Sequence, residues 1–220
     1  MDSITLAFNT YFSFLTIACL LSVNLQSKDL RINLLRFLMI YTFLSEVLAV
    51  IFIMLFQNNI IINNIWLLIV PALFIFIVSS EINCLKKPVK GSLSIIYVGF
   101  AILNLLFFEG LHTFNAYTSH FGVLVVLMLV FFKFKEYFDD PSSDIVRDPL
   151  FYFLIALFFF YIGGFLVNIA INYLIEINMN IAVQLLVIRN IVNCITYSLF
   201  SLALIIDYFN RKKLSLTSAT

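Results

Sequence analysis

Charged residues are scarce in this chain of 220 residues: only 11% are Asp, Glu, Lys or Arg, whereas 63% are hydrophobic. A soluble domain carries about 25% charged residues, so a chain of this composition cannot hide its apolar side chains from water. The formal net charge is only +1, which gives no basic surface for nucleic acid. We therefore expect the lipid bilayer as the main surroundings of the chain, and no nucleic-acid partner.

Cysteine and the motifs of common enzymes are also lacking. The three cysteines are scattered and have no Cys-x-x-Cys spacing, so we expect neither a disulfide nor a metal site from them. The sequence contains no P-loop, no dinucleotide-binding glycine pattern, no Gly-x-Ser-x-Gly and no His-Glu-x-x-His. No cofactor is predicted, no catalytic residue can be named, and an enzyme is not the favoured class.

Long apolar runs fill most of the sequence, and a helix needs about 20 mostly apolar residues to cross the hydrocarbon. The first run has no basic residues before it and is longer than the apolar part of a signal peptide, so we expect a retained helix. The predicted fold is a single all-α membrane domain over residues 1–220. Its seven transmembrane helices are expected near residues 4–25, 34–57, 62–80, 92–111, 119–135, 150–172 and 183–208.

Basic residues fall on one side of this predicted bundle. Of the thirteen Lys and Arg residues, all but Arg189 lie around alternate connections or after the last helix. The connections 57–64, 110–119 and 172–183 contain none. The positive-inside rule places the basic side in the cytoplasm. We therefore expect the N-terminus outside and the C-terminus in the cytoplasm.

The longest connection, residues 135–149, is polar. It carries Glu136, Asp139, Asp140, Asp144 and Asp148. We consider two interpretations of it: a solvated connector, or, with the tail 210–220, a docking surface for a cytoplasmic signalling partner. At its end, Asp148 and Pro149 predict a helix start, because Asp caps helices and Pro fits the first turn.

Two charged residues are predicted at membrane depth, where a charge is costly and often functional. Glu46 lies near the middle of the second span, and Arg189 lies below the outer end of the seventh. Their depths should differ by roughly 8 Å at 1.5 Å per residue, which an inward Arg side chain could largely bridge. Three interpretations stay open: a structural ion pair, a ligand or proton site, and an Arg189 that reaches the headgroups. The charge of Glu46 also stays open, because burial favours its neutral form and a nearby Arg its charged form.

Other polar side chains gather in the predicted outer halves of several helices. Asn side chains often join membrane helices by hydrogen bonds, and spacings of three or four residues place several of them on shared helix faces. Their gathering predicts an outward-facing polar pocket that serves a ligand or the structure. Its expected members are Glu46, Arg189, Asn193, Tyr197, Asn168, Asn104 and Glu109.

A metal site is not predicted at the two histidines. Glu109 and His112 have the Glu-x-x-His spacing of some helical metal sites, but the motif has no symmetric partner and contains Gly110. We interpret them as polar residues at the membrane interface.

Four short runs resemble a known group of membrane proteins. They are Tyr41-Thr42-Phe43-Leu44-Ser45-Glu46, Asn63-Asn64-Ile65-Trp66, Phe114-Asn115-Ala116-Tyr117 and Tyr161-x-Gly163-Gly164. Over most of its length the chain is similar to small bacterial seven-helix membrane proteins of uncharacterised function. The resemblance implies the bacterial inner membrane and a sensing or signalling role, since related proteins accompany histidine kinases. A looser similarity to lysoplasmalogenase-like membrane proteins rests on helix count and Glu46, and the sequence lacks a second carboxylate at membrane depth.

The favoured function is therefore a receptor-like or signalling membrane module. It would bind a small ligand or lipid in the outer pocket, with Glu46 and Arg189 as anchors, and pass a helix shift to the loop 133–149 and the tail. One alternative is a structural or accessory subunit of a membrane complex. Another is a small transporter or an intramembrane lipid hydrolase.

Overall fold

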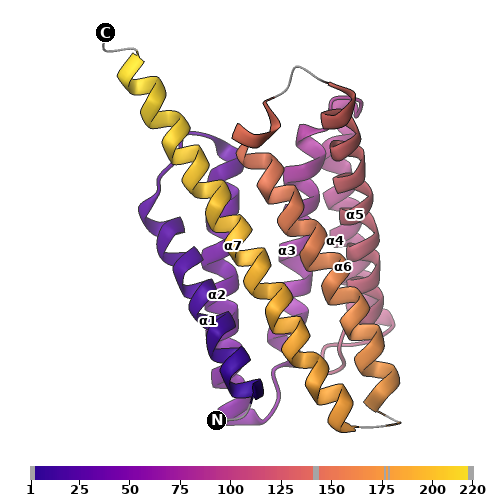
Figure 1. The fold of residues 1–220 in the computed structure, drawn as a ribbon. Helices are drawn as coiled ribbons and strands as arrows, with labels where there is room; N and C mark the ends of the chain where they lie inside the picture. The colour runs from indigo at the N-terminus through magenta and orange to yellow at the C-terminus, as the bar shows by residue number, and fades with distance from the viewer. Residues whose placement is uncertain (1–2, 141–143, 176, 178, 218–220) are drawn as a thin grey trace. The chain divides into compact units, whose positions relative to one another are not determined.

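The computed structural model describes residues 3–140, 144–175, 177 and 179–217, and within these ranges it contains helices and no strand. The all-α class is confirmed, and each predicted span is a helix (Figure 1). The helices are α1 (Ser3–Asn24), α2 (Leu30–Phe56), α3 (Ile60–Glu81), α4 (Lys87–Phe107), α5 (Ala116–Asp139), α6 (Pro149–Ile175) and α7 (Met179–Thr217), with a short 3-10 helix η1 (Ile145–Arg147) before α6.

Six of these helices, all except α5, are long and apolar enough to cross a membrane. The chain is thus a multi-pass membrane protein. In α5 the apolar run Phe121–Phe132 lies between polar ends and is roughly 18 Å long at 1.5 Å per residue. The hydrocarbon is about 30 Å thick. The crossing of α5 and the orientation of the termini stay predictions.

Several helices continue past the predicted spans into charged sequence. The start of α2 includes Arg31, α5 runs on to Asp139, and α7 runs on to Thr217. The fifth span was predicted to end at residue 135, so the prediction that a connection follows directly was wrong for 136–139. Hydropathy marks the part of a helix that lipid can cover, whereas the backbone hydrogen bonds of a helix can continue beyond that part into water.

One helix start was predicted correctly. Asp148 Oδ1 accepts the N–H of Leu150 at 2.9 Å, and Pro149 is the first residue of α6. The cap satisfies one of the N–H groups that a helix start leaves without a partner.

The chain divides into two compact units, the first from residues 1–36 and 142–220 and the second from 37–141. The prediction of a single domain stays a prediction. In the first unit, α7 packs along both α1 and α6. Gly163 allows the close approach of α6 to α7, because an added Cβ would lie 2.7 Å from Val192 Cγ1. Arg36 on α2 caps the C-terminal end of α1, because its Nε donates to the carbonyl of Ser22 at 2.6 Å.

In the second unit, α3 packs against α4 and α5 around a proline. Pro71 has no N–H, so the carbonyl of Leu67, four residues earlier, lacks its helical donor. The buried hydroxyl of Tyr97 on α4 donates to that carbonyl at 2.6 Å. Gly122 on α5 leaves room for Tyr97, since an added Cβ would lie 3.2 Å from its ring and hydroxyl. Three helices are thus fixed at one point.

Candidate functional site

Polar side chains gather at one end of the second unit, where the turn 108–115 joins α4 to α5. We call Asn64, Asn104, Glu109, Asn115 and Thr118 the loop network. Asn64, in the first part of α3, is 3% exposed. Its Nδ2 donates to the carbonyls of Leu111 at 3.2 Å and Thr113 at 2.8 Å, and its Oδ1 accepts the N–H of Asn115 at 3.1 Å. One buried amide therefore satisfies three backbone groups of the turn.

Glu109 caps the start of α5. Its carboxylate accepts the N–H of Ala116 at 3.1 Å and that of Tyr117 at 3.3 Å. The first N–H groups of a helix have no partner inside it, and negative charge is favoured there. Asn104 on α4 donates from Nδ2 to this carboxylate and, at 3.0 Å, to the hydroxyl of Thr118 on α5.

Asn115 is the least satisfied member of the loop network. It holds the N-cap position of α5 but makes no side-chain cap hydrogen bond, although Asn usually accepts an N–H there. Glu109 accepts the N–H groups that begin α5 in its place. Asn115 is 2% exposed, and its Oδ1 is enclosed without a donor among the described residues. The network can thus accept a further hydrogen bond from a donor group.

The structure brings two of the predicted site residues together. Asn104 and Glu109 are hydrogen-bonded, but Glu109 was predicted on a helix and lies beyond the end of α4, before Gly110 with φ +79°. Glycine adopts this backbone conformation without strain, so the chain turns here and Glu109 folds back onto Asn104.

The other predicted residues are distributed over both units. Glu46 is half-buried on α2 in the second unit, and Arg189 is exposed on α7 in the first. On α7, Asn193 is half-buried, whereas Tyr197 is buried with its ring centroid 5.8 Å from that of Tyr11. The side chain of Asn168 lies outside the described residues. The Glu46–Arg189 pair and the shared pocket stay predictions.

Sequence reasoning missed three members of the loop network: Asn64, Asn115 and Thr118. A signal was present, because Asn64 and Asn115 belong to runs that carried the family resemblance. Their proximity depends on the return of the chain from α3 through α4, which no local spacing contains.

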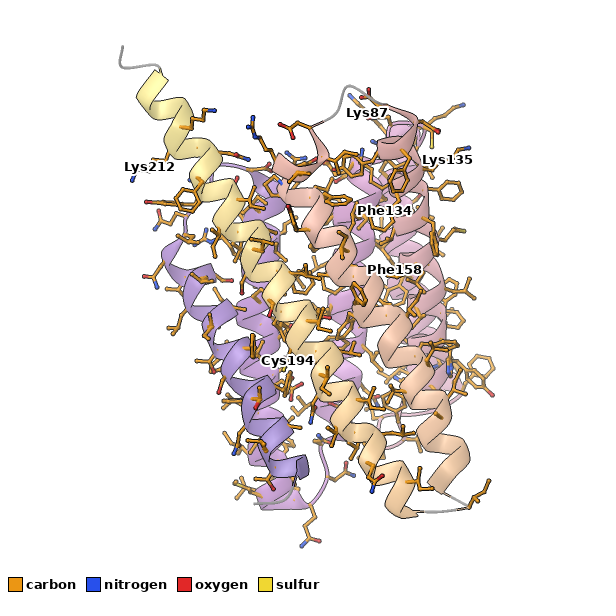
Figure 2. The ribbon with its side chains drawn as sticks, in the orientation of Figure 1. Lys87, Phe134, Lys135, Phe158, Cys194 and Lys212 are labelled. Atoms are coloured by element: carbon orange, nitrogen blue, oxygen red, sulfur yellow. The ribbon has the colours of Figure 1, made fainter. Side chains whose placement is uncertain are left out.

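A second cluster lies at the other end of α3, and we call Glu81, Cys84, Lys90, Lys133 and Glu136 the lysine network. Lys133 on α5 is 8% exposed and donates to the carbonyl of Glu81 at 2.8 Å and to Glu136 Oε2 at 3.0 Å. Lys90 donates to the carbonyl of Ser80 at 2.8 Å. The last carbonyls of a helix lack partners and attract cations. Figure 2 shows Lys87 and Lys135 at this same end of the second unit.

Glu136 links α5 to the turn after α3. Its Oε1 accepts the N–H of Cys84 at 3.1 Å. Burial alone would raise the pKa of Glu136, but the hydrogen bonds from Lys133 and from the N–H of Cys84 outweigh it, and the pKa is lowered. The carboxylate therefore stays charged at neutral pH and keeps its ion pair.

Neither network has the form of a metal centre. Among the described residues, no three or more His, Cys, Asp or Glu side chains could hold a metal ion together. Glu109 is engaged as a cap, and His112 is exposed in the turn. Comparison with protein-family models, with curated proteins and with solved structures finds no match to this chain.

Proposed function

We propose that this protein is a receptor-like membrane module in which the loop network receives a ligand and α5 transmits the response. The observation that carries the proposal is that α5 is held by side chains at both ends. Glu109 and Asn104 hold its start, and Lys133 and Glu136 tie its last turns to α3. A shift at one end therefore has to be accommodated at the other.

The contacts also favour a class of ligand. The turn 108–115 carries one carboxylate and no Lys or Arg, and Asn115 Oδ1 can accept a further hydrogen bond. A small protonated amine suits this chemistry, because it carries both a positive charge and N–H donors. By engaging Glu109 it would compete with the N–H groups of Ala116 and Tyr117, and so loosen the start of α5. The predicted roles of Glu46 and of Arg189 at membrane depth stay predictions.

The orientation completes the proposal. With the basic ends in the cytoplasm, the loop network faces outward and the connector 140–148 faces a cytoplasmic signalling partner. The proposed location is the bacterial inner membrane.

Cys84 offers a built-in reporter for the transmission step. Its thiol is free and exposed, and its backbone N–H is bound to Glu136. We expect Glu109→Ala to change the maleimide labelling rate of Cys84 by about threefold or more, because local opening of an exposed turn costs little free energy and a shift of α5 changes it. His112→Ala, in the same turn but exposed, serves as the matched control and should leave the rate unchanged.

An unchanged Cys84 rate in folded Glu109→Ala protein would overturn the transmission proposal. If that variant does not fold, Glu109→Gln replaces it, because the amide oxygen still caps α5 while the charge is lost. A thermal-stability screen with small primary amines tests the ligand class: stabilisation should be present in the wild type and absent in Glu109→Gln. Stoichiometric copurification with another membrane protein, without amine binding, would favour the accessory subunit.

A further inference from the structure

The C-terminal part of α7 extends beyond the helices packed against it in the first unit. α7 has 39 residues, which is about 58 Å at 1.5 Å per residue, whereas the hydrocarbon is about 30 Å thick. Asn210 Nδ2 donates to the carbonyl of Arg147 at 2.8 Å, which places Asn210 beside η1, just before α6 begins. The residues after Asn210 therefore continue past the start of α6, as Figure 1 shows for the yellow end of the ribbon.

This end of α7 combines aromatic and basic side chains. Tyr208 and Phe209 are exposed, Phe209 to 61%, and Arg211, Lys212 and Lys213 follow directly. Figure 2 shows Lys212 on this extension. Aromatic rings that stand beside basic residues are typical of the boundary between hydrocarbon and headgroups.

Three carboxylates at this end of the first unit have an arginine partner close in sequence. The ion pairs are Asp29–Arg31, Asp144–Arg147 and Asp207–Arg211. Asp148 is engaged as the cap of α6. Basic residues outnumber acidic residues at this end, and Lys28, Lys212 and Lys213 contribute to its positive charge from exposed positions.

Arg211 has further donor capacity. Its Nε donates to Asp207 Oδ2 at 2.9 Å, while its Nη2 has no acceptor among the described residues. The side chain is 32% exposed, so a rotation of its outer bonds can present the guanidinium to an anion. A phosphate oxygen is a suitable acceptor, since guanidinium and phosphate match in geometry and charge.

We propose that the end of α7, residues 208–213, with Lys28, binds the phosphate of anionic lipid headgroups. The rings of Tyr208 and Phe209 lie at the interface, and Arg211, Lys212 and Lys213 contact the phosphates. A lipid fits better than a soluble acidic partner because the basic residues directly follow the aromatic pair along the helix. They are thus within a Debye length of the headgroups, about 8 Å at physiological ionic strength.

The test uses the purified full-length chain and native mass spectrometry. The protein is titrated with phosphatidylglycerol, with phosphatidylcholine and, in a separate arm, with inorganic phosphate. We expect the wild type to retain phosphatidylglycerol over phosphatidylcholine, and 0.5 M salt to reduce that retention because it screens exposed charges. Lys212→Gln/Lys213→Gln should reduce retention by about three- to tenfold, since each exposed base contributes to attraction by an anionic surface.

Two variants with matched changes make the result specific. Lys86→Gln/Lys87→Gln removes the same charge from exposed positions of the second unit and should retain the lipid as the wild type does. Lys212→Arg/Lys213→Arg keeps the charge and should retain it also. Equal losses in both glutamine variants, or no loss in Lys212→Gln/Lys213→Gln, would overturn the proposal. Displacement of the lipid by millimolar inorganic phosphate would assign the site to free phosphate and overturn the lipid assignment.

Discussion

The two ends of the second unit are fixed by opposite chemistry. At the loop network, the amide of Asn64 and the carboxylate of Glu109 accept hydrogen bonds from N–H groups of the turn and of the start of α5. At the lysine network, ammonium groups donate to the last carbonyls of α3. The difference follows from the helix dipole, because a helix start attracts negative charge and a helix end attracts positive charge. The same physics therefore places the capping acid Glu109 and the capping bases Lys90 and Lys133 at opposite ends of this unit.

The largest effect should come from removing the buried base of the lysine network. Lys133→Met leaves Glu136 without its ion partner and the carbonyl of Glu81 without its donor. We expect the free energy of unfolding to fall by about 3 kcal/mol, because breaking a buried pair strands the remaining charge. Thermal unfolding in detergent measures the loss. Lys135→Met, which removes a neighbouring exposed base, is the control and should change stability little.

The loss of unfolding free energy should be somewhat smaller at the loop network, because its most connected side chain, Asn64, is neutral. Asn64→Ala removes three hydrogen bonds to the turn 108–115, and we expect a loss of about 2 kcal/mol. Hydrogen exchange should accelerate most in the turn and by a smaller factor at residues 79–85, which α5 links to it. Equal acceleration at both ends would mean that the two networks unfold together. Asn63→Ala is the matched control on the same helix.

A smaller effect should follow from a change inside the loop network. Thr118→Val keeps the side-chain shape but removes the hydroxyl that accepts from Asn104. Because Asn104 still donates to Glu109, we expect a loss of only about 1 kcal/mol. Chemical unfolding of the variant beside Ser119→Ala measures it. A loss as large as that of Lys133→Met would contradict the ranking of the two networks.

The smallest effect is the loss of stability at low pH that results from protonation of Glu136 in the lysine network. The pKa of Glu136 is lowered in the folded protein, so its stabilising contribution is fully present above the unfolded value of about 4.3. That contribution falls as the pH drops through the folded pKa, because the neutral carboxyl no longer pairs with Lys133. We expect the stability of the wild type to decrease below about pH 4 and that of Glu136→Gln to lack this component. Equal acid profiles of the two proteins would show that other carboxyls determine it.

The sequence predicts the helices of this protein well and their polar ends poorly. Long apolar runs in lipid leave a backbone few alternatives to a helix, so all seven helices lie where apolar runs predict them. The ends depend on partners that are distant in sequence. Asn64 gains its partners only when the turn 108–115 packs against α3. Lys133 becomes buried only when α5 packs on the end of α3.

The candidate site shows the same limit at one residue. The spacing of Asn104 and Glu109 suggested neighbouring polar residues, and they are neighbours. The spacing gave the wrong reason, because α4 ends at Phe107 and Gly110 turns the chain back. No sequence period reports such a turn, and none reports that Glu109 would cap the following helix.

The proline of α3 has a consequence for biogenesis. A lone α3 that left the translocation machinery would expose the carbonyl of Leu67 to lipid, where an unsatisfied backbone group costs several kcal/mol. Tyr97 on the next helix removes that penalty through its hydroxyl. The α3–α4 hairpin is thus favoured to enter the bilayer as a pair, so that a tyrosine made later in synthesis completes a helix made earlier.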